Sequence, residues 1–225
     1  MKKIKDDFVE LYKNAASYYS IPFKWSRKQW QQAIIIIFSF LILFLADEPM
    51  RTFFSGIHNK YFDSIFSFAH WYGKPALTIT VFAVLYMFGL VVGDEKSRMA
   101  GWKIFQAFII SGILVTAIKS LFGRWRPYTE HGSFDFVFLT TGPNAHLSLP
   151  SGDAAVAFAF STIVAGFIDN KLWKVFWFSL ATLTLFGRIY HDQHWLTDVT
   201  MAAFISVSAG LHINKQAQIK NIHNE

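Results

Sequence analysis

Six apolar runs dominate this sequence, and each approaches the length that a helix needs to cross a lipid bilayer. They occupy residues 30–45, 75–92, 101–118, 151–168, 172–186 and 196–213. Runs of roughly 18 residues or more with few charges are typical of membrane-spanning helices, and 53% of this chain is hydrophobic while only 16% is charged. We therefore expect an all-α fold, a polytopic six-transmembrane-helix bundle in which the shorter runs extend by about one turn.

Two segments outside these runs carry apolar side chains at helical spacing between charged ones. One covers residues 4–19 and ends before Pro22, and the other covers residues 53–72. This pattern is typical of amphipathic helices that lie in the membrane interface. With no internal repeat and no flexible linker, the chain is expected to form one domain, flanked by a segment at each terminus. We expect an interfacial, cytoplasmic segment at 1–29, the six-helix domain at 30–214 and a cytoplasmic tail at 215–225.

The distribution of Lys and Arg sets the expected orientation in the membrane. With six spans both termini lie on one side, and fourteen of the 21 Lys and Arg residues fall on that side. Because these residues favour the cytoplasmic side, we expect cytoplasmic termini. The outer side nevertheless holds a cluster of four cations that runs against this bias and needs another explanation. They are Lys119, Arg124, Arg126 and Arg188.

Two polar clusters lie at the outer ends of the third and fourth runs. The first, at residues 119–127, reads Lys-Ser-Leu-Phe-Gly-Arg-Trp-Arg-Pro, and its cations taken alone are explained by side chains that reach the lipid headgroups. The second, Leu-Pro-Ser-Gly-Asp at 149–153, contains residues that favour the start of any helix. A helix start with a glycine also binds anions through its free N–H groups and its dipole.

The third cluster leads into the sixth run and contains Arg188, His194 and Asp198. His194 and Asp198 are four residues apart and therefore share one face of a helix. A carboxylate in that position holds one imidazole nitrogen protonated and leaves the other free to attack. An interfacial histidine beside a helix-capping aspartate explains the pair equally well.

The three clusters together indicate more than each does alone, because the expected topology places all of them on the outer side. Three cations near a helix start suit a phosphate dianion, and the histidine–aspartate pair beside them supplies a nucleophile. We therefore expect a phosphate-binding catalytic site at the outer face of the membrane.

The sequence resembles the type-2 phosphatidic acid phosphatases, a family related to the vanadium haloperoxidases. The family pattern is Lys-x6-Arg-Pro, then Pro-Ser-Gly-His, then Ser-Arg-x5-His-x3-Asp. Its three parts are matched in order by Lys119 with Arg126 and Pro127, by Pro150, Ser151 and Gly152, and by Arg188, His194 and Asp198. The resemblance extends over residues 30–213 and includes the layout of the six runs.

Two positions depart from this pattern. The serine before the arginine of the third part is Gly187 here, and the histidine that ends the second part is Asp153. In the family that histidine is thought to protonate the departing alkoxide, which an ionised carboxylate cannot do. With three cations nearby, we expect Asp153 to be mostly a carboxylate that activates water in the second step. A protonated Asp153 that acts as the acid is the alternative.

The resemblance implies a mechanism that needs no metal ion and no other cofactor. His194 attacks phosphorus and forms a phosphohistidine, which water then hydrolyses, while Asp198 orients His194. Five further groups bind the phosphate oxygens, whose charge grows in the transition state. They are Lys119, Arg126, Ser151, Gly152 and Arg188. No additional carboxylate cluster suited to a pair of metal ions is seen on the outer side.

The resemblance also implies a lipid phosphate as substrate and a bacterial cytoplasmic membrane as location. The candidate substrates are undecaprenyl diphosphate, lipid A, phosphatidylglycerophosphate and phosphatidic acid. A diphosphate or the anomeric phosphate of lipid A needs less protonation of its leaving group. With Asp153 in place of the histidine, these two rank slightly above phosphatidic acid. Membrane lipids are the other expected partners, and the sequence does not indicate an oligomeric state.

Two other functions stay open at this point. A lipid phosphotransferase would pass the phosphate from the phosphohistidine to an acceptor other than water. A protein that binds lipid phosphates without turnover would have lost its acid at Asp153, although the nucleophile and its orienting residue are intact. Haloperoxidase activity is disfavoured because those enzymes are soluble. Nucleic-acid binding is disfavoured because the basic residues flank the apolar runs rather than form one stripe.

Overall fold

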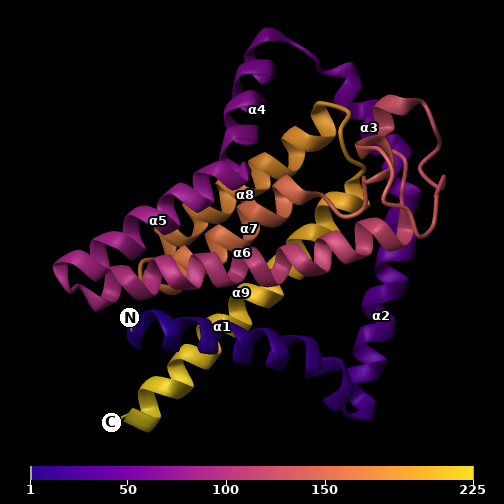
Figure 1. The fold of residues 1–225 in the computed structure, drawn as a ribbon. Helices are drawn as coiled ribbons and strands as arrows, with labels where there is room; N and C mark the ends of the chain where they lie inside the picture. The colour runs from indigo at the N-terminus through magenta and orange to yellow at the C-terminus, as the bar shows by residue number, and fades with distance from the viewer. Residues whose placement is uncertain (1, 225) are drawn as a thin grey trace.

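The computed structural model describes residues 2–224, which fold into helices joined by short turns and one longer loop (Figure 1). The α-helices are α1 (Lys2–Ser20), α2 (Arg27–Leu43), α3 (Asp47–Gly56), α4 (Lys60–Tyr72), α5 (Pro75–Val92), α6 (Glu95–Phe122), α7 (Gly152–Gly166), α8 (Lys171–Tyr190) and α9 (Leu196–Asn224). Short 3-10 turns are η1 (Ile21–Lys24), η2 (Phe44–Ala46), η3 (Pro127–Thr129) and η4 (Asn144–His146). Over this range the expected all-α class is confirmed, since extended pairing is limited to an isolated bridge between Arg124 and Phe136.

Four helical stretches are long and apolar enough to cross a membrane. They are Arg27–Gly56, which joins α2, η2 and α3, then α5, α6 and Leu196–Ile219 of α9. The chain is therefore an integral membrane protein. The other two expected spans correspond to α7 and α8, and α7 has only 15 residues. At 1.5 Å per residue it is roughly 22 Å long, against a hydrocarbon core of about 30 Å. Six crossings thus stay a prediction.

The short helix α7 forms the centre of the bundle. It packs against α6, α8 and α9, and every residue from Ala154 to Ile163 is buried. Alanines at 154, 155, 157 and 159 let the neighbouring helices approach closely. Because protein rather than lipid surrounds α7, it fits inside the bundle without matching the thickness of the bilayer.

Local signals fix the helix ends from which the site is built. Gly123 ends α6 in the left-handed conformation, with φ at 53°, and a Cβ there would collide with the carbonyl oxygen of Val137. This glycine turns the chain from α6 into the long loop that carries Arg126. Ser151 caps α7, because its hydroxyl accepts the N–H of Ala154 at 3.4 Å.

The N-terminal helix α1 packs differently from a helix that buries only its apolar stripe. Its polar residues Asp7 and Asn14 are buried against the bundle, where Asp7 accepts a hydrogen bond from Arg98 and Asn14 donates to Gln106 at 2.7 Å. Buried polar groups are tolerated when they are paired in this way. The apolar stripe is divided, because Tyr18 and Tyr19 pack against the core whereas Phe8 and Tyr12 are exposed. Its contact with the membrane interface remains a prediction. At the other end, the expected tail continues α9 as a helix to Asn224, and Glu225 lies outside the described residues.

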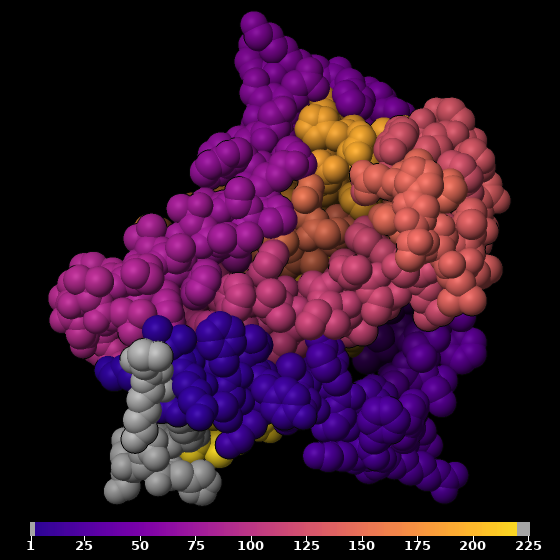
Figure 2. Space-filling model, in the orientation of Figure 1, coloured from indigo at the N-terminus to yellow at the C-terminus, as the bar shows by residue number. Residues whose placement is uncertain are grey.

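The second expected interfacial helix is divided into α3 and α4. Within its apolar stripe Phe54 and Tyr72 are buried in the core, whereas Tyr61 and Phe68 are exposed. Part of the stripe therefore packs in the protein core, and part of it lies on the surface. Helix α4 packs against α8 and leans over the bundle (Figure 1). In the space-filling view, α4 and α5 border one side of a hollow and the long loop borders the other (Figure 2).

Candidate active site

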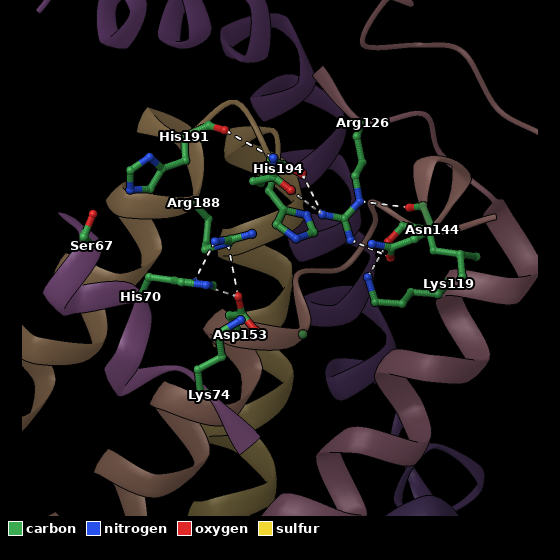
Figure 3. A pocket seen from close by; sticks show the side chains of 13 residues that line it. Ser67, His70, Lys74, Lys119, Arg126, Asn144, Asp153, Arg188, His191 and His194 are labelled. Atoms are coloured by element: carbon green, nitrogen blue, oxygen red, sulfur yellow. Dashed lines mark hydrogen bonds and ion pairs between the residues drawn. The ribbon is translucent and has the colours of Figure 1, made fainter. Parts of the chain in front are cut away.

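A cavity of about 710 Å³ brings the three sequence clusters together, and it coincides with the hollow in Figure 2. The predicted site residues that line it are Lys119, Arg126, Gly152, Asp153, Arg188 and His194. Ser151 and Asp198 do not reach the lining, and both are fully buried. Residues that are far apart in the sequence thus converge on a single cavity (Figure 3).

The imidazole of His194 faces the cavity and is backed by Asp198. Its Nδ1 lies 3.5 Å from Asp198 Oδ2. The Ser148 hydroxyl bridges the pair, since it donates to Asp198 Oδ2 at 2.5 Å and lies 3.4 Å from His194 Nδ1. Asp198 Oδ2 also accepts the Trp195 N–H at 2.9 Å. Because Nδ1 is turned toward Asp198, Nε2 is the nitrogen left for chemistry in the cavity.

Burial keeps the His194 ring neutral. Only 2% of the residue is exposed, and this burial lowers its pKa to about 3. Asp198 acts in the opposite direction, while the positive charges of Arg126 and Lys119 lower the pKa further. The neutral imidazole is the nucleophilic form, and the ring is in this form across the physiological pH range.

The orienting carboxylate belongs to a buried charged network centred on Arg124. Its Nη1 donates to Asp198 Oδ1 at 2.7 Å and its Nη2 to Asp47 Oδ2 at 2.6 Å, and none of these three side chains is exposed. Asp47 also accepts the N–H and the hydroxyl of Thr197, at 2.8 and 2.6 Å. Buried charges are costly unless they are paired and hydrogen-bonded. The network therefore fixes Asp198 behind His194, a role that the sequence did not reveal for Arg124 or Asp47.

Lys119 and Arg126 form one wall of the cavity (Figure 3). Lys119 Nζ donates to Leu147 O at 2.5 Å. Arg126 Nε donates to Asn144 O at 2.9 Å, and its Nη1 donates to Gln193 Oε1 at 3.1 Å. Burial lowers the pKa of the Arg126 guanidinium from its usual value. Within residues 2–224 neither side chain forms an ion pair with a carboxylate, so an anion bound there would not compete with a carboxylate for them.

Arg188 lies on the other side of His194, together with Asp153 and His70 (Figure 3). Its Nη1 is 2.7 Å from His70 Nδ1, and its Nε is 3.3 Å from Asp153 Oδ2. That Nε is buried and has no hydrogen-bond partner in the described part of the chain. His70 was not predicted as a site residue, because it was one polar position in an amphipathic stripe.

The start of α7 meets the cavity at Gly152. A Cβ at this position would find no atom within 4 Å, so the residue borders open space. The N–H of Ser151 donates to Asp198 O at 3.0 Å, which links the second cluster to the third. Free N–H groups and the helix dipole at this end favour a bound anion.

The fold and the cavity define a helical membrane protein with a cation-lined cavity and a neutral histidine facing it. The chain belongs to the PAP2 superfamily, whose family model matches residues 100–222. The matched segment contains all three clusters and confirms the resemblance to the type-2 phosphatidic acid phosphatases.

Among the described residues, no group of three or more His, Asp or Glu side chains is placed to hold a metal ion.

Two solved structures share this fold. The crystal structure of Aquifex aeolicus LpxE matches with a TM-score of 0.58 and 24% identity, over 75% of this chain and 94% of that chain. The crystal structure of the first transmembrane PAP2 type phosphatidylglycerolphosphate phosphatase from Bacillus subtilis matches with a TM-score of 0.59 and 16% identity, over 82% of this chain and 95% of that chain. At these identities the likeness establishes a common fold. No curated protein sequence matches the chain.

Proposed function

We propose that the protein is a metal-independent lipid phosphatase that hydrolyses a phosphomonoester or diphosphate on a lipid headgroup. The observation that carries this proposal is the neutral His194 imidazole, which faces a cavity lined by cations. They are Lys74 and the three predicted cations Lys119, Arg126 and Arg188. Membership of the PAP2 superfamily supports the same function, as does the fold shared with a phosphatidylglycerolphosphate phosphatase.

The proposed reaction has two steps. In the first, Nε2 of His194 attacks phosphorus in line, and the bond from phosphorus to the lipid oxygen breaks as the phosphohistidine forms. Asp198 holds the Nδ1 proton and stabilises the charged ring, while the cations neutralise the charge on the equatorial oxygens. In the second step, a water oxygen attacks the same phosphorus, the P–N bond breaks and inorganic phosphate leaves.

The surroundings of the cavity support a lipid substrate. Ser67 and His70 of α4 line the cavity, whereas Phe68 and Trp71 of the same helix are 63% and 60% exposed. Large exposed apolar side chains beside a polar cavity suit a ligand with a charged head and apolar chains. We propose that the acyl or isoprenoid chains lie along α4. The proposal also places the cavity at the outer face of the cytoplasmic membrane and the termini in the cytoplasm.

The test is the release of inorganic phosphate by the purified protein in detergent, from a panel of lipid mono- and diphosphates. His194→Ala should lower the release by about 10³-fold or more, because it removes the nucleophile. The control is His131→Ala, which truncates an exposed loop histidine outside the cavity. Activity should also survive a metal chelator.

Three results would contradict this proposal. If the protein is a lipid phosphotransferase, inorganic phosphate will not appear. A phosphorylated product will form only when an acceptor is added. A lipid-phosphate binding protein would retain substrate without turnover. Full inhibition by chelator, reversed by a divalent ion, would show that the reaction needs a metal.

A further inference from the structure

A second histidine–carboxylate pair lies in the same cavity as His194. His70, on α4, has its Nδ1 3.1 Å from Asp153 Oδ2 and 2.7 Å from Arg188 Nη1. Its ring reaches from α4 toward both of these groups (Figure 3). The side chain is 28% exposed and lines the cavity, so a ligand bound there has access to it.

Two glycines allow α4 to approach closely enough for these contacts. A Cβ at Gly73 would stand 2.8 Å from the carbonyl oxygen of Asp153 and 2.7 Å from Thr184 Cγ2. A Cβ at Gly187 would stand 3.3 Å from the carbonyl oxygen of Phe66. Positions 153 and 187 are the two at which the sequence departs from the family pattern. The residues at both of these positions therefore lie against α4 or its C-terminal end, and α4 is the helix that carries His70.

We propose that His70 is the general acid of this lipid phosphatase and that Asp153 holds it in place, an inference that rests on the function proposed above. An ionised aspartate has no proton to give, whereas an imidazole both donates and accepts protons near neutral pH. Asp153 faces Nδ1 and leaves Nε2 for the leaving oxygen, the same relation that Asp198 has to His194. The imidazole that the family pattern places at position 153 is supplied here by a neighbouring helix.

The contacts of His70 link its protonation to phosphate binding. Arg188 Nη1 donates to Nδ1, which therefore carries no proton in this arrangement, and burial together with the Arg188 charge lowers the pKa of His70. Asp153 acts in the opposite direction, and Lys74 and His191 add to the lowering. A phosphate dianion that engages Arg188 removes this donor and adds negative charge. Nδ1 then takes up a proton from the solvent and pairs with Asp153.

Each proton in the two steps is accounted for. As the N–P bond to His194 forms and the P–O bond to the lipid breaks, the Nε2 proton of His70 moves to the lipid oxygen and the alcohol leaves. The neutral His70 then takes a proton from water as the water oxygen bonds to phosphorus and the P–N bond breaks. Inorganic phosphate leaves and His194 is neutral again. Arg188 then donates to His70 once more, and the Nδ1 proton of His70 returns to the solvent. With such an acid present, the leaving group of a phosphomonoester can be protonated. Diphosphates then have no advantage as substrates on the ground that their leaving group needs less protonation.

The experiment compares two substrates with the same alkyl chain, an alkyl phosphate and an alkyl-substituted nitrophenyl phosphate. The nitrophenolate leaves without a proton, whereas the alkoxide needs one. The measured quantity is kcat/KM, which reports only the steps up to departure of the leaving group and so excludes the water step that both substrates share. His70→Asn should lower kcat/KM for the alkyl phosphate by about 10²–10⁴-fold and leave kcat/KM for the nitrophenyl phosphate nearly unchanged. The matched control is His58→Asn, because His58 also lies near a carboxylate, 3.8 Å from Asp63, but outside the cavity.

Two further variants distinguish an acid from a structural residue. Asp153→Asn should reproduce the substrate pattern of His70→Asn, because it frees the ring from its partner. In His70→Ala, added imidazole should restore kcat/KM for the alkyl phosphate selectively. An equal loss of kcat/KM on both substrates, or no loss on either, would overturn the assignment of His70. A wild-type protein that releases phosphate from neither substrate would refute the proposed function, and this inference with it.

Discussion

Replacing Arg124 by lysine tests whether the buried network holds Asp198 in place. The guanidinium uses all five of its N–H groups, with two bonds to Ser133 O and one each to Thr197 Oγ1, Asp198 Oδ1 and Asp47 Oδ2. A lysine ammonium keeps the charge but has three donors, so at least two of these bonds are lost. At about 1.5–3 kcal/mol for each hydrogen bond to a charged group, the free energy of unfolding should fall by about 3–6 kcal/mol.

The assay is unfolding by SDS in mixed micelles, combined with kcat for lipid phosphate hydrolysis. Arg51→Lys is the matched control, because Arg51 pairs with Asp192 and Glu130 at a more exposed position. Exposed pairs contribute only about 0–1 kcal/mol. We expect Arg124→Lys to lower kcat more than it raises KM, since it disturbs Asp198 rather than a phosphate ligand. Equal stability of the two variants, together with wild-type kcat, would refute the role given to the network.

The remaining predictions concern protonation and topology. His194 should be neutral in ¹⁵N-imidazole NMR spectra of the micelle-bound protein at about pH 5, because burial lowers its pKa to about 3; a ring that titrates near 6.5 would contradict this burial. The unfolded ring takes up a proton below about 6.5, so the stability that depends on the neutral ring should decrease as the pH falls through that value toward 3. The chain contains no cysteine, so Thr141→Cys should react with an impermeant maleimide in intact cells, and Lys171→Cys only after lysis. The opposite labelling would overturn the proposed orientation.

Local patterns in the sequence were sufficient to predict several elements of the fold. The bounds of α5 agree with the apolar run at 75–92, because Pro75 occupies the first turn and Gly93, with φ at 81°, ends the helix. The meeting of the three clusters was also predictable, since each lies at the outer end of an apolar run in the expected topology. Their residues indeed line a single cavity.

Contacts between residues that are distant in the sequence were beyond prediction from spacing alone. Asp47 pairs with Arg124 across 77 positions, and His70 contacts Arg188 across 118. Periodicity identifies the faces of a helix but not which face packs against protein, so it did not reveal that α1 buries Asp7 and Asn14. For the same reason, a short apolar run such as α7 gave no sign that other helices surround it on all sides.

The phosphohistidine is the most direct test of the central claim. The wild-type protein is mixed with a lipid phosphate labelled in its phosphoryl group, and the reaction is quenched at high pH, where phosphohistidine survives. We predict labelled protein at early times, with the label on His194, lost on acid treatment and absent in His194→Ala. Rapid release of phosphate without labelled protein, or a label that persists in His194→Ala, would contradict catalysis by this histidine.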